Sequence, residues 1–203
     1  MPFGPLTISF DDRVLRPRPW TLAQSTWGAE LANRLPDGPV VELCAGVGHI
    51  GLAVAAAVKR DVLLVDADPH AGELARENAL AAGLDQRVEV RVASVESALA
   101  PDEMFPLMLV DPPWVPSGGT DAFPDDPTTA IDGGADGLDL ARTCMDVCAR
   151  HLGPCGAVLL QLADHEQVRA ISGYLASRPE LGLTVAEVRH PQANGVLVRL
   201  THS

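Results

Sequence analysis

The stretch "VELCAGVGHIG", residues 41–51, decides the fold. An apolar run ends there in a glycine-rich turn, where Gly46, Gly48 and Gly51 spell GxGxxG, and an apolar helical pattern begins. The next apolar run ends at Asp66, twenty residues after Gly46. Such a strand, turn and helix let the backbone approach a ligand closely, and a carboxylate at the second strand end can accept hydrogen bonds from ribose hydroxyls. The stretch therefore predicts a nucleotide-binding α/β unit.

Short β-branched runs alternate with helical patterns from residue 39 onward. This alternation is typical of a parallel sheet with helices on both faces. Only "PQAN" (191–194) separates the last two runs, which predicts an antiparallel hairpin closing a seven-stranded, mostly parallel sheet. The predicted strands are 39–44, 61–66, 87–92, 106–111, 156–162, 183–190 and 195–200, and the predicted helices are 49–59, 69–82, 95–100, 136–152 and 164–177.

The chain before the first strand reads differently. We expect residues 1–36 to be an appendage and residues 37–203 to form the cofactor-binding domain. A second exception is the stretch 116–134, a long loop without periodicity, and loops of that length are usually functional or disordered. The elements predicted in the appendage are a small hairpin at 6–17, around Asp11 and Asp12, and a helix at 21–35 that opens with a capping box of Thr21 and Gln24.

Composition limits the function classes. The 203 residues are 47% apolar, which suits one substantial core, and no stretch is long and apolar enough for a membrane span. We therefore expect a cytoplasmic protein with no membrane partner. The net charge of −12 makes nucleic acid an unlikely partner without help, because nucleic-acid affinity depends on neutralising phosphates. None of the four cysteines forms a CxxC pair, so we expect core thiols and no metal site.

The residues around the glycine turn choose between cofactors. The turn fits a nicotinamide cofactor and S-adenosylmethionine alike. Glu42, at the end of the first strand, would repel a pyrophosphate but suits a cationic amino group and sulfonium, so it favours S-adenosylmethionine. Asp66 is expected to bind the ribose, and Asp68 to cap the helix that begins at Pro69. Ser94 lies after the third strand, where an adenine is expected.

The corner "DPPW", residues 111–114, follows the fourth predicted strand and faces the same crevice. Asp111 and the carbonyl of Pro112 present two acceptors, and prolines at 112 and 113 supply no backbone donors of their own. Trp114 adds a flat apolar wall. A planar amino group complements this arrangement, since it has two donors and a π-face. Asp111, Pro112, Pro113 and Trp114 are therefore the predicted catalytic residues.

At this point the residues resemble the class I S-adenosylmethionine-dependent methyltransferases, within them the amino-methylating group with a [DNS]-PP-[YFW] signature. The chain is similar to the HemK-type enzymes, which methylate a glutamine side-chain amide in peptide-chain release factors. "VLRPRPWT" (14–21), "VDADPHAGELARENALAAGL" (65–84) and the segment 130–166 resemble further family blocks, so the likeness covers nearly the whole chain.

The resemblance implies a Rossmann-like fold, S-adenosylmethionine as cofactor and a protein or small-molecule substrate that bears a planar amine or amide. It implies that residues 111–114 hold the substrate amide. Some short family members need a small zinc-binding activator, so a partner of that kind is also implied. The residues implied to line the cofactor are Thr21, Glu42, Ala45, Gly46, Gly48 and Asp66.

The chain departs from the family pattern at four positions. Asp111 stands where asparagine is preferred, Trp114 where tyrosine is usual, Cys44 in place of a glycine, and Ser94 in place of an acid that reaches adenine. An asparagine both donates and accepts, whereas an ionised aspartate only accepts, which fits a pure amino group better.

Several functions stay open at this level. A small-molecule or nucleobase amino-methyltransferase shares the corner, an NAD-dependent oxidoreductase shares the glycine turn, and a non-catalytic cofactor-binding subunit would share both. His49 lies in the turn, and we expect it to be a surface histidine.

Overall fold

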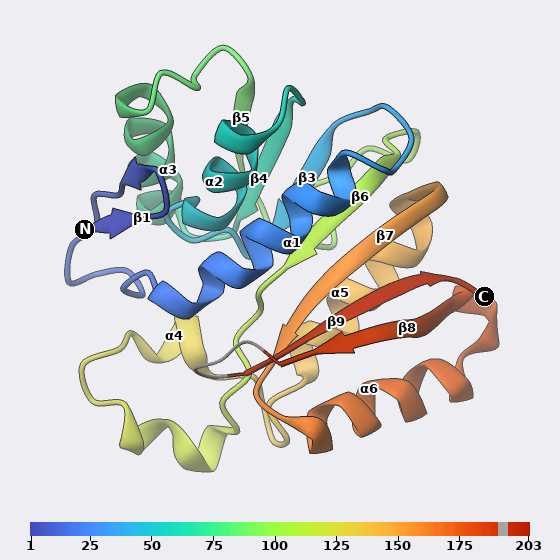
Figure 1. Cartoon of the computed structure of the whole chain (residues 1–203). Helices are drawn as coiled ribbons and strands as arrows, with labels where there is room; N and C mark the ends of the chain where they lie inside the picture. The colour runs from blue at the N-terminus through green and yellow to red at the C-terminus, as the bar shows by residue number, and fades with distance from the viewer. Residues whose placement is uncertain (191–194) are drawn as a thin grey trace.

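The structure, a computed structural model, describes residues 1–190 and 195–203. Its centre is a seven-stranded sheet in the order β5-β4-β3-β6-β7-β9-β8 (Figure 1). Strand β9 runs antiparallel to β7 and β8, and the other neighbouring pairs are parallel. The predicted fold class is confirmed. The strands are β3 (Val40–Leu43), β4 (Val62–Asp66), β5 (Val88–Val92), β6 (Phe105–Val110), β7 (Leu152–Leu162), β8 (Leu183–Arg189) and β9 (Val196–His202).

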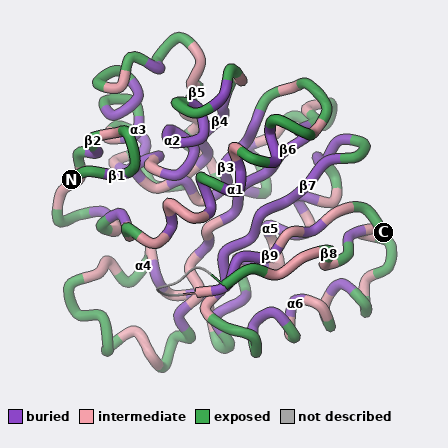
Figure 2. The backbone as a smooth tube through the Cα atoms, viewed as in Figure 1, coloured by how far each residue is buried: buried purple, intermediate pink, exposed green. Residues whose placement is uncertain are grey.

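Helices cover both faces of the sheet because successive side chains of a strand point in opposite directions. Leu107 and Leu109 of β6 pack with the residues of α1, α2 and α3, whereas Met108 and Val110 pack with those of α5 and α6. Figure 2 shows the central strands buried between these layers. The helices are α1 (Leu22–Ala32), α2 (His49–Ala57), α3 (Pro69–Ala81), α5 (Asp139–His151) and α6 (His165–Ser177).

The chain reverses its path across the sheet at β3. It first continues to β4 and β5 on one side, and then crosses to β6 and β7 on the other. Ligands of open α/β sheets bind at such a reversal, outside the carboxyl ends of the strands. Glu42 in β3, Asp66 at the end of β4 and Asp111 directly after β6 therefore reach one edge through topology alone.

Two predicted elements are wrong, the helix at 95–100 and the hairpin at 6–17. Residues 95–100 form turns instead of a helix. Their backbone is held from outside, because Arg91 donates to the Ala98 carbonyl over 2.7 Å and Glu103 accepts from the Ala100 N–H over 2.7 Å. The first hairpin is β1 (Pro2–Phe3) with β2 (Leu6–Thr7), and it turns at Gly4 with a φ of 56°. It does not lie around Asp11, whose carboxylate instead accepts from Arg13 and contacts His70.

The structure also bears on the predicted loop at 116–134 and on the predicted C-terminal hairpin. The stretch 116–134 is not a uniform loop, since it contains the 3-10 helix η2 (Ser117–Ala122) and the short helix α4 (Thr128–Ile131). The pairing of β8 with β9 confirms the antiparallel C-terminal strands, while the "PQAN" turn at 191–194 lies outside the described residues. Among the described residues, no helix combines the length and apolarity that crossing a membrane requires.

Helix α1 is attached to the sheet by a buried glutamine. The Gln24 Nε2 donates to the carbonyls of Leu159 in β7 over 2.9 Å and of Val110 in β6 over 3.2 Å. The predicted capping box is therefore wrong: Thr21 makes no side-chain cap, and its hydroxyl donates to the Arg18 carbonyl over 2.8 Å in the 3-10 turn η1 (Pro19–Thr21). Gln24, which precedes β3 in the chain, thus links β6 and β7 close to their carboxyl ends.

We expect Gln24→Leu to lower the free energy of unfolding by about 1–3 kcal/mol, because two buried carbonyls lose a donor. Asn33→Ala is the matched control, since the Asn33 amide makes a similar 3.0 Å bond to Ala29 but is exposed. That change should cost less than about 0.5 kcal/mol. Urea denaturation of the three proteins measures both values, and equal losses would show that Gln24 does not anchor the helix.

Candidate active site

The glycine turn between β3 and α2 combines close packing with an open face. Gly46 and Gly48 have φ values of 53° and 80°, a region that glycine enters without strain. A Cβ at Gly48 would lie 2.7 Å from Leu64, and one at Gly51 would lie 2.5 Å from the Glu42 carboxyl. A Cβ at Gly46 would meet no atom within 4 Å. Two of the glycines therefore seat the helix on the sheet, and Gly46 leaves room beside the turn.

Two carboxyl groups are bound to this turn. Asp66 accepts from the Gly46 N–H over 2.7 Å with one oxygen and from the Asp68 N–H over 2.9 Å with the other. Glu42 accepts from the Gly51 N–H over 2.8 Å with Oε2, while its Oε1 is buried without a partner among the described residues. The site thus holds a buried acceptor, Glu42 Oε1, that has no hydrogen-bond partner among the described residues, close to the turn at Gly46, where there is free space. Asp68 caps α3 by accepting from His70 N over 2.8 Å, as predicted.

The three carboxyl groups at this edge have unusual acidities. Burial raises the pKa of Glu42 well above its ordinary range, and repulsion from Asp111 and Asp66 raises it further. Burial also raises the pKa of Asp66, and it raises the pKa of Asp111 to about 7. A nearby positive charge would reverse these shifts, because it favours the ionised carboxylates. The electrostatics of the edge therefore favour a cationic ligand.

Cys44 follows β3 in a left-handed conformation, with a φ of 60°. Residues other than glycine rarely adopt such a φ, so the position is one that suits glycine. Its sulfur lies 4.0 Å from that of Cys144 in α5. Cys144 and Cys148 are buried as core thiols, as predicted, whereas Cys155 is exposed.

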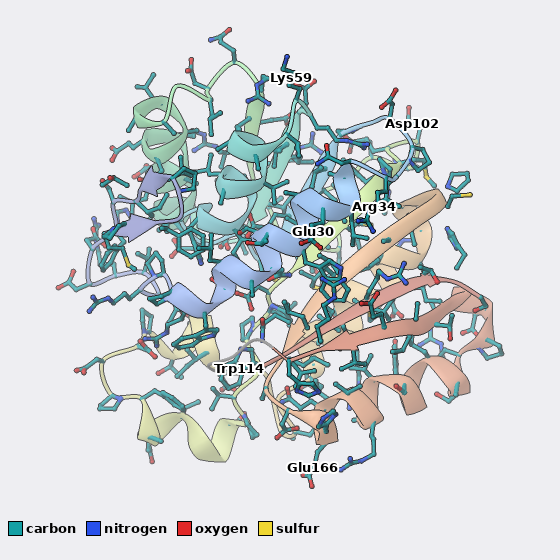
Figure 3. The ribbon with its side chains drawn as sticks, viewed as in Figure 1. Glu30, Arg34, Lys59, Asp102, Trp114 and Glu166 are labelled. Atoms are coloured by element: carbon teal, nitrogen blue, oxygen red, sulfur yellow. The ribbon has the colours of Figure 1, made fainter. Side chains whose placement is uncertain are left out.

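The DPPW corner forms one wall of a pocket of about 350 Å³. Figure 3 shows Trp114 at the carboxyl end of the sheet, between the ends of the strands and the segment that carries α4. Trp20 and Thr21, ahead of α1, also line the pocket. All four corner residues and Thr21 line this pocket, whereas Glu42, Gly46 and Asp66 lie beside it at the neighbouring strand ends. The remaining lining residues include Leu15, Arg18, Phe123, Asp126, Ala130, Ile131, Gln161 and Ala163.

Close backbone packing holds the corner in place. Gln167 of α6 donates to the Trp114 carbonyl over 2.8 Å and accepts from the Ala163 N–H over 2.9 Å. Gly133 and Gly137 pass directly behind it, and a Cβ on them would lie 2.7 Å from the Pro113 oxygen and 2.3 Å from the Trp114 oxygen. Gly133 and Gly137 of the "GGADG" segment are therefore required by the approach of two backbones.

One of the two residues expected near the ligand, His49, has a different environment from the predicted one, whereas the assignment of Ser94 stays a prediction. His49 is not a surface residue: its ring packs edge-on against Phe3 with centroids 4.9 Å apart, and its Nε2 lies 3.2 Å from Thr21 Oγ1. Burial lowers the pKa of His49 to about 4, so the ring is neutral at pH 7. Ser94 is exposed, and its hydroxyl lies 3.0 Å from that of Ser97. Sequence reasoning missed Gln161 and Gln167 and gave Gln24 a different role, since no local motif marks the distant partners of Gln24 and Gln167 or the place of Gln161 in the pocket.

Comparison with known proteins agrees with this geometry. Residues 28–123 match the family model "Methyltransferase small domain". The solved structure of the human Mettl16 catalytic domain in complex with an RNA hairpin has a TM-score of 0.74 at 14% identity and covers 98% of this chain and 77% of that one. With the sheet topology and the carboxyl-lined edge, these findings define a class I methyltransferase, an enzyme class that uses S-adenosylmethionine.

The sequence relatives narrow the family. A release factor glutamine methyltransferase of Deinococcus radiodurans is 32% identical over 95% of this chain and 72% of its own length. Another with that name, from Mycolicibacterium smegmatis, is 34% identical over 85% of this chain and 62% of its own. A ribosomal protein uL3 glutamine methyltransferase of Bradyrhizobium diazoefficiens is 32% identical over 77% of this chain and 53% of its own.

The chain belongs to the HemK-type family of methyltransferases, to which the release factor glutamine methyltransferases belong. It spans between 53% and 72% of the length of these three relatives. The left-handed φ of Cys44 agrees with the family resemblance, which implies a glycine at this position.

We expect Gly137→Ala to abolish most methyl transfer, because its Cβ would displace the Trp114 carbonyl. Gly182→Ala is the matched control: Gly182 also has a positive φ, of 61°, but a Cβ there meets no atom within 4 Å. Both changes should cost about 1 kcal/mol of stability for the strained φ. Methyl-transfer assays at equal folded fraction separate the two, and equal activity of both variants would contradict a rigid corner.

Proposed function

We propose that this enzyme methylates the side-chain amide nitrogen of a glutamine in a protein substrate. The single observation that carries the proposal is the rigid DPPW corner in an apolar pocket beside the carboxyl-lined edge. The family relatives that bear the name glutamine methyltransferase support the same acceptor. The two prolines have no backbone N–H, so they do not compete with the substrate for the nearby acceptor oxygens. The indole of Trp114 suits the face of a planar amide.

The residues of the edge fit S-adenosylmethionine. Glu42 Oε1, which has no partner among residues 1–190 and 195–203, and the raised pKa values fit a cationic amino acid and sulfonium, and the open side of Gly46 leaves space for the ligand. We assign Asp66 to the ribose and Glu42 to the cationic end. Bound there, the cofactor supplies an electrophilic methyl group. The other residues assigned to the cofactor are Thr21, Ala45, Gly48 and Ser94.

The corner then has two tasks. Asp111 and the Pro112 carbonyl accept the two N–H groups of the amide and fix the plane of the nitrogen, and Trp114 covers one face. Holding a weak nucleophile in line with its electrophile can remove several kcal/mol of barrier. As the nitrogen gains a methyl group it must lose a proton, and the Asp111 carboxylate is in place to accept it. An aspartate therefore does what an asparagine cannot at this position.

We expect kcat/KM, measured at saturating S-adenosylmethionine, to rise with pH, with a midpoint below 7, because the bound sulfonium lowers the pKa of Asp111 from its value of about 7 in the free enzyme. Below its pKa the Asp111 carboxyl is protonated, so it cannot take up the proton that the amide nitrogen loses. Asp111→Asn should retain an acceptor oxygen, lower kcat and flatten the profile. A variant with an unchanged midpoint would show that another group titrates.

The cofactor assignment has a matched test of its own. Asp66→Ala should weaken binding of S-adenosylhomocysteine at least tenfold by calorimetry, because it removes the ribose acceptor and the bond to Gly46. Asp68→Ala, two residues away, removes only the α3 cap. It should cost about 1 kcal/mol of stability and leave the affinity unchanged. Equal losses of affinity would contradict the assignment of Asp66.

The acceptor is tested by transfer of labelled methyl groups to purified release factor, ribosomal protein uL3, RNA and small amines, with mass spectrometry locating the label. Label on a protein glutamine supports the proposal, and its choice of protein identifies the substrate. Label only on RNA or amines would overturn it. Assays with and without a lysate fraction test the implied activator, and a binding assay with NAD(H) tests the oxidoreductase chemistry that the turn alone permits.

A further inference from the structure

Gln161 carries the one buried side-chain acceptor of the pocket that has no partner within the described ranges. Its side chain is only 1% exposed, it lines the pocket, and its Oε1 makes no hydrogen bond among those residues. Gln161 is the second-last residue of β7. A buried carbonyl without a donor is unfavourable unless a ligand supplies the donor. The mechanism described above makes no use of this atom.

The sheet places Gln161 beside Asp111. Val110 of β6 pairs with Leu160 of β7, so Asp111 and Gln161 follow at the same level on neighbouring strands. Their side chains project to the face that α1 covers, because Leu109 and Leu159, two residues earlier, both pack there. Neighbouring strands lie about 4.8 Å apart. The pocket therefore holds two acceptors at about one strand spacing.

The amide of Gln161 has a fixed orientation. Its Nε2 donates to the Leu162 carbonyl over 3.0 Å, and because a carbonyl can only accept, the nitrogen must face that side. Gly195 packs over the amide, since a Cβ there would lie 2.0 Å from Nε2. With the nitrogen committed and the amide covered on that side, Oε1 is the atom left for a ligand.

We propose that Gln161 Oε1 accepts a main-chain N–H of the substrate polypeptide, next to the glutamine whose amide Asp111 holds. This inference rests on the proposed function and narrows its substrate class. Asp111 and the Pro112 carbonyl take both N–H groups of the carboxamide, so Gln161 requires a different donor. Within a glutamine residue and its neighbour, the donors within reach are the main-chain N–H groups. The enzyme therefore recognises a glutamine inside a chain, and Gln161 is a specificity-determining residue.

Ester substitution in a peptide substrate tests this directly. A short peptide that spans the methylated glutamine is compared with two analogues, in which an ester oxygen replaces the N–H of the glutamine or of the following residue. We expect one analogue to lose roughly 10-fold to 100-fold in kcat/KM, through KM, as a buried acceptor loses its donor. If neither analogue loses activity, the proposal is overturned, and that outcome needs no variant.

A double-mutant cycle assigns the loss to Gln161. Gln161→Met keeps the length of the side chain and removes the acceptor, so it should lose the same factor on the amide peptide and nothing further on the sensitive ester. Gln161→Glu keeps an acceptor oxygen and should keep part of the effect. Gln24→Leu is the matched control, since Gln24 is equally buried and its Oε1 also has no partner in the part of the chain that the structure describes, but it does not line the pocket. It should show the full ester penalty.

The outcomes separate the inference from the function on which it rests. If the wild type methylates neither the peptide nor the intact protein, the proposed function fails. If it methylates both and the ester penalty in Gln161→Met equals that of the wild type, the function stands and Gln161 does not bind the main chain. Unchanged binding of S-adenosylhomocysteine by each variant confirms that the fold and the cofactor site are intact.

Discussion

Three carboxyl groups held at one edge of a parallel sheet are the constraint on which this site depends. Glu42, Asp66 and Asp111 meet there because β3, β4 and β6 end together at the reversal of the chain path. Burial raises the pKa of each, and one Glu42 oxygen is left without a partner in the described chain. Buried charges need compensation, which a cationic ligand supplies and a pyrophosphate would oppose. The same arrangement thus favours a cationic ligand and sets the acidity of Asp111.

Glycine acts in this site mostly through what it allows other residues to do. Gly51 lets α2 approach the Glu42 carboxyl, and Gly133 and Gly137 let one backbone pass behind Pro113 and Trp114. A Cβ at any one of these glycines would prevent the close approach. Rigid positioning of the corner therefore comes from backbone packing, and the side chains that perform chemistry can stay few. The glycines of these motifs thus permit close backbone packing as well as tight turns.

The sheet and the site edge were predictable from sequence because both follow from local patterns. Apolar runs marked every strand of the large sheet, and parallel topology then brought Glu42, Asp66 and Asp111 together. Three of the failures arise from contacts that periodicity does not report, and in the cases of Gln24 and His49 the partner lies far away in sequence. Residues 95–100 have their backbone satisfied by Arg91 and Glu103 instead of by a helix. Gln24 looked like a cap but reaches strands 86 and 135 residues away, and His49 is covered by the first hairpin. Periodicity carries no information about such contacts.

The pocket is assembled from segments that sequence alone treats as accessory. Trp20 comes from the segment before α1, Phe123 from the long connection after the corner, and an Arg18–Asp126 ion pair joins these two segments. Apolar and aromatic walls discriminate weakly between ligands of similar shape, whereas an unpaired buried polar group discriminates strongly. Substrate choice in such a pocket therefore depends on its polar acceptors. Asp111 directly after β6 and Gln161 in β7 lie at the same level. If both bind the substrate as proposed, the distance between two donors on the substrate, more than its bulk, decides what this enzyme methylates.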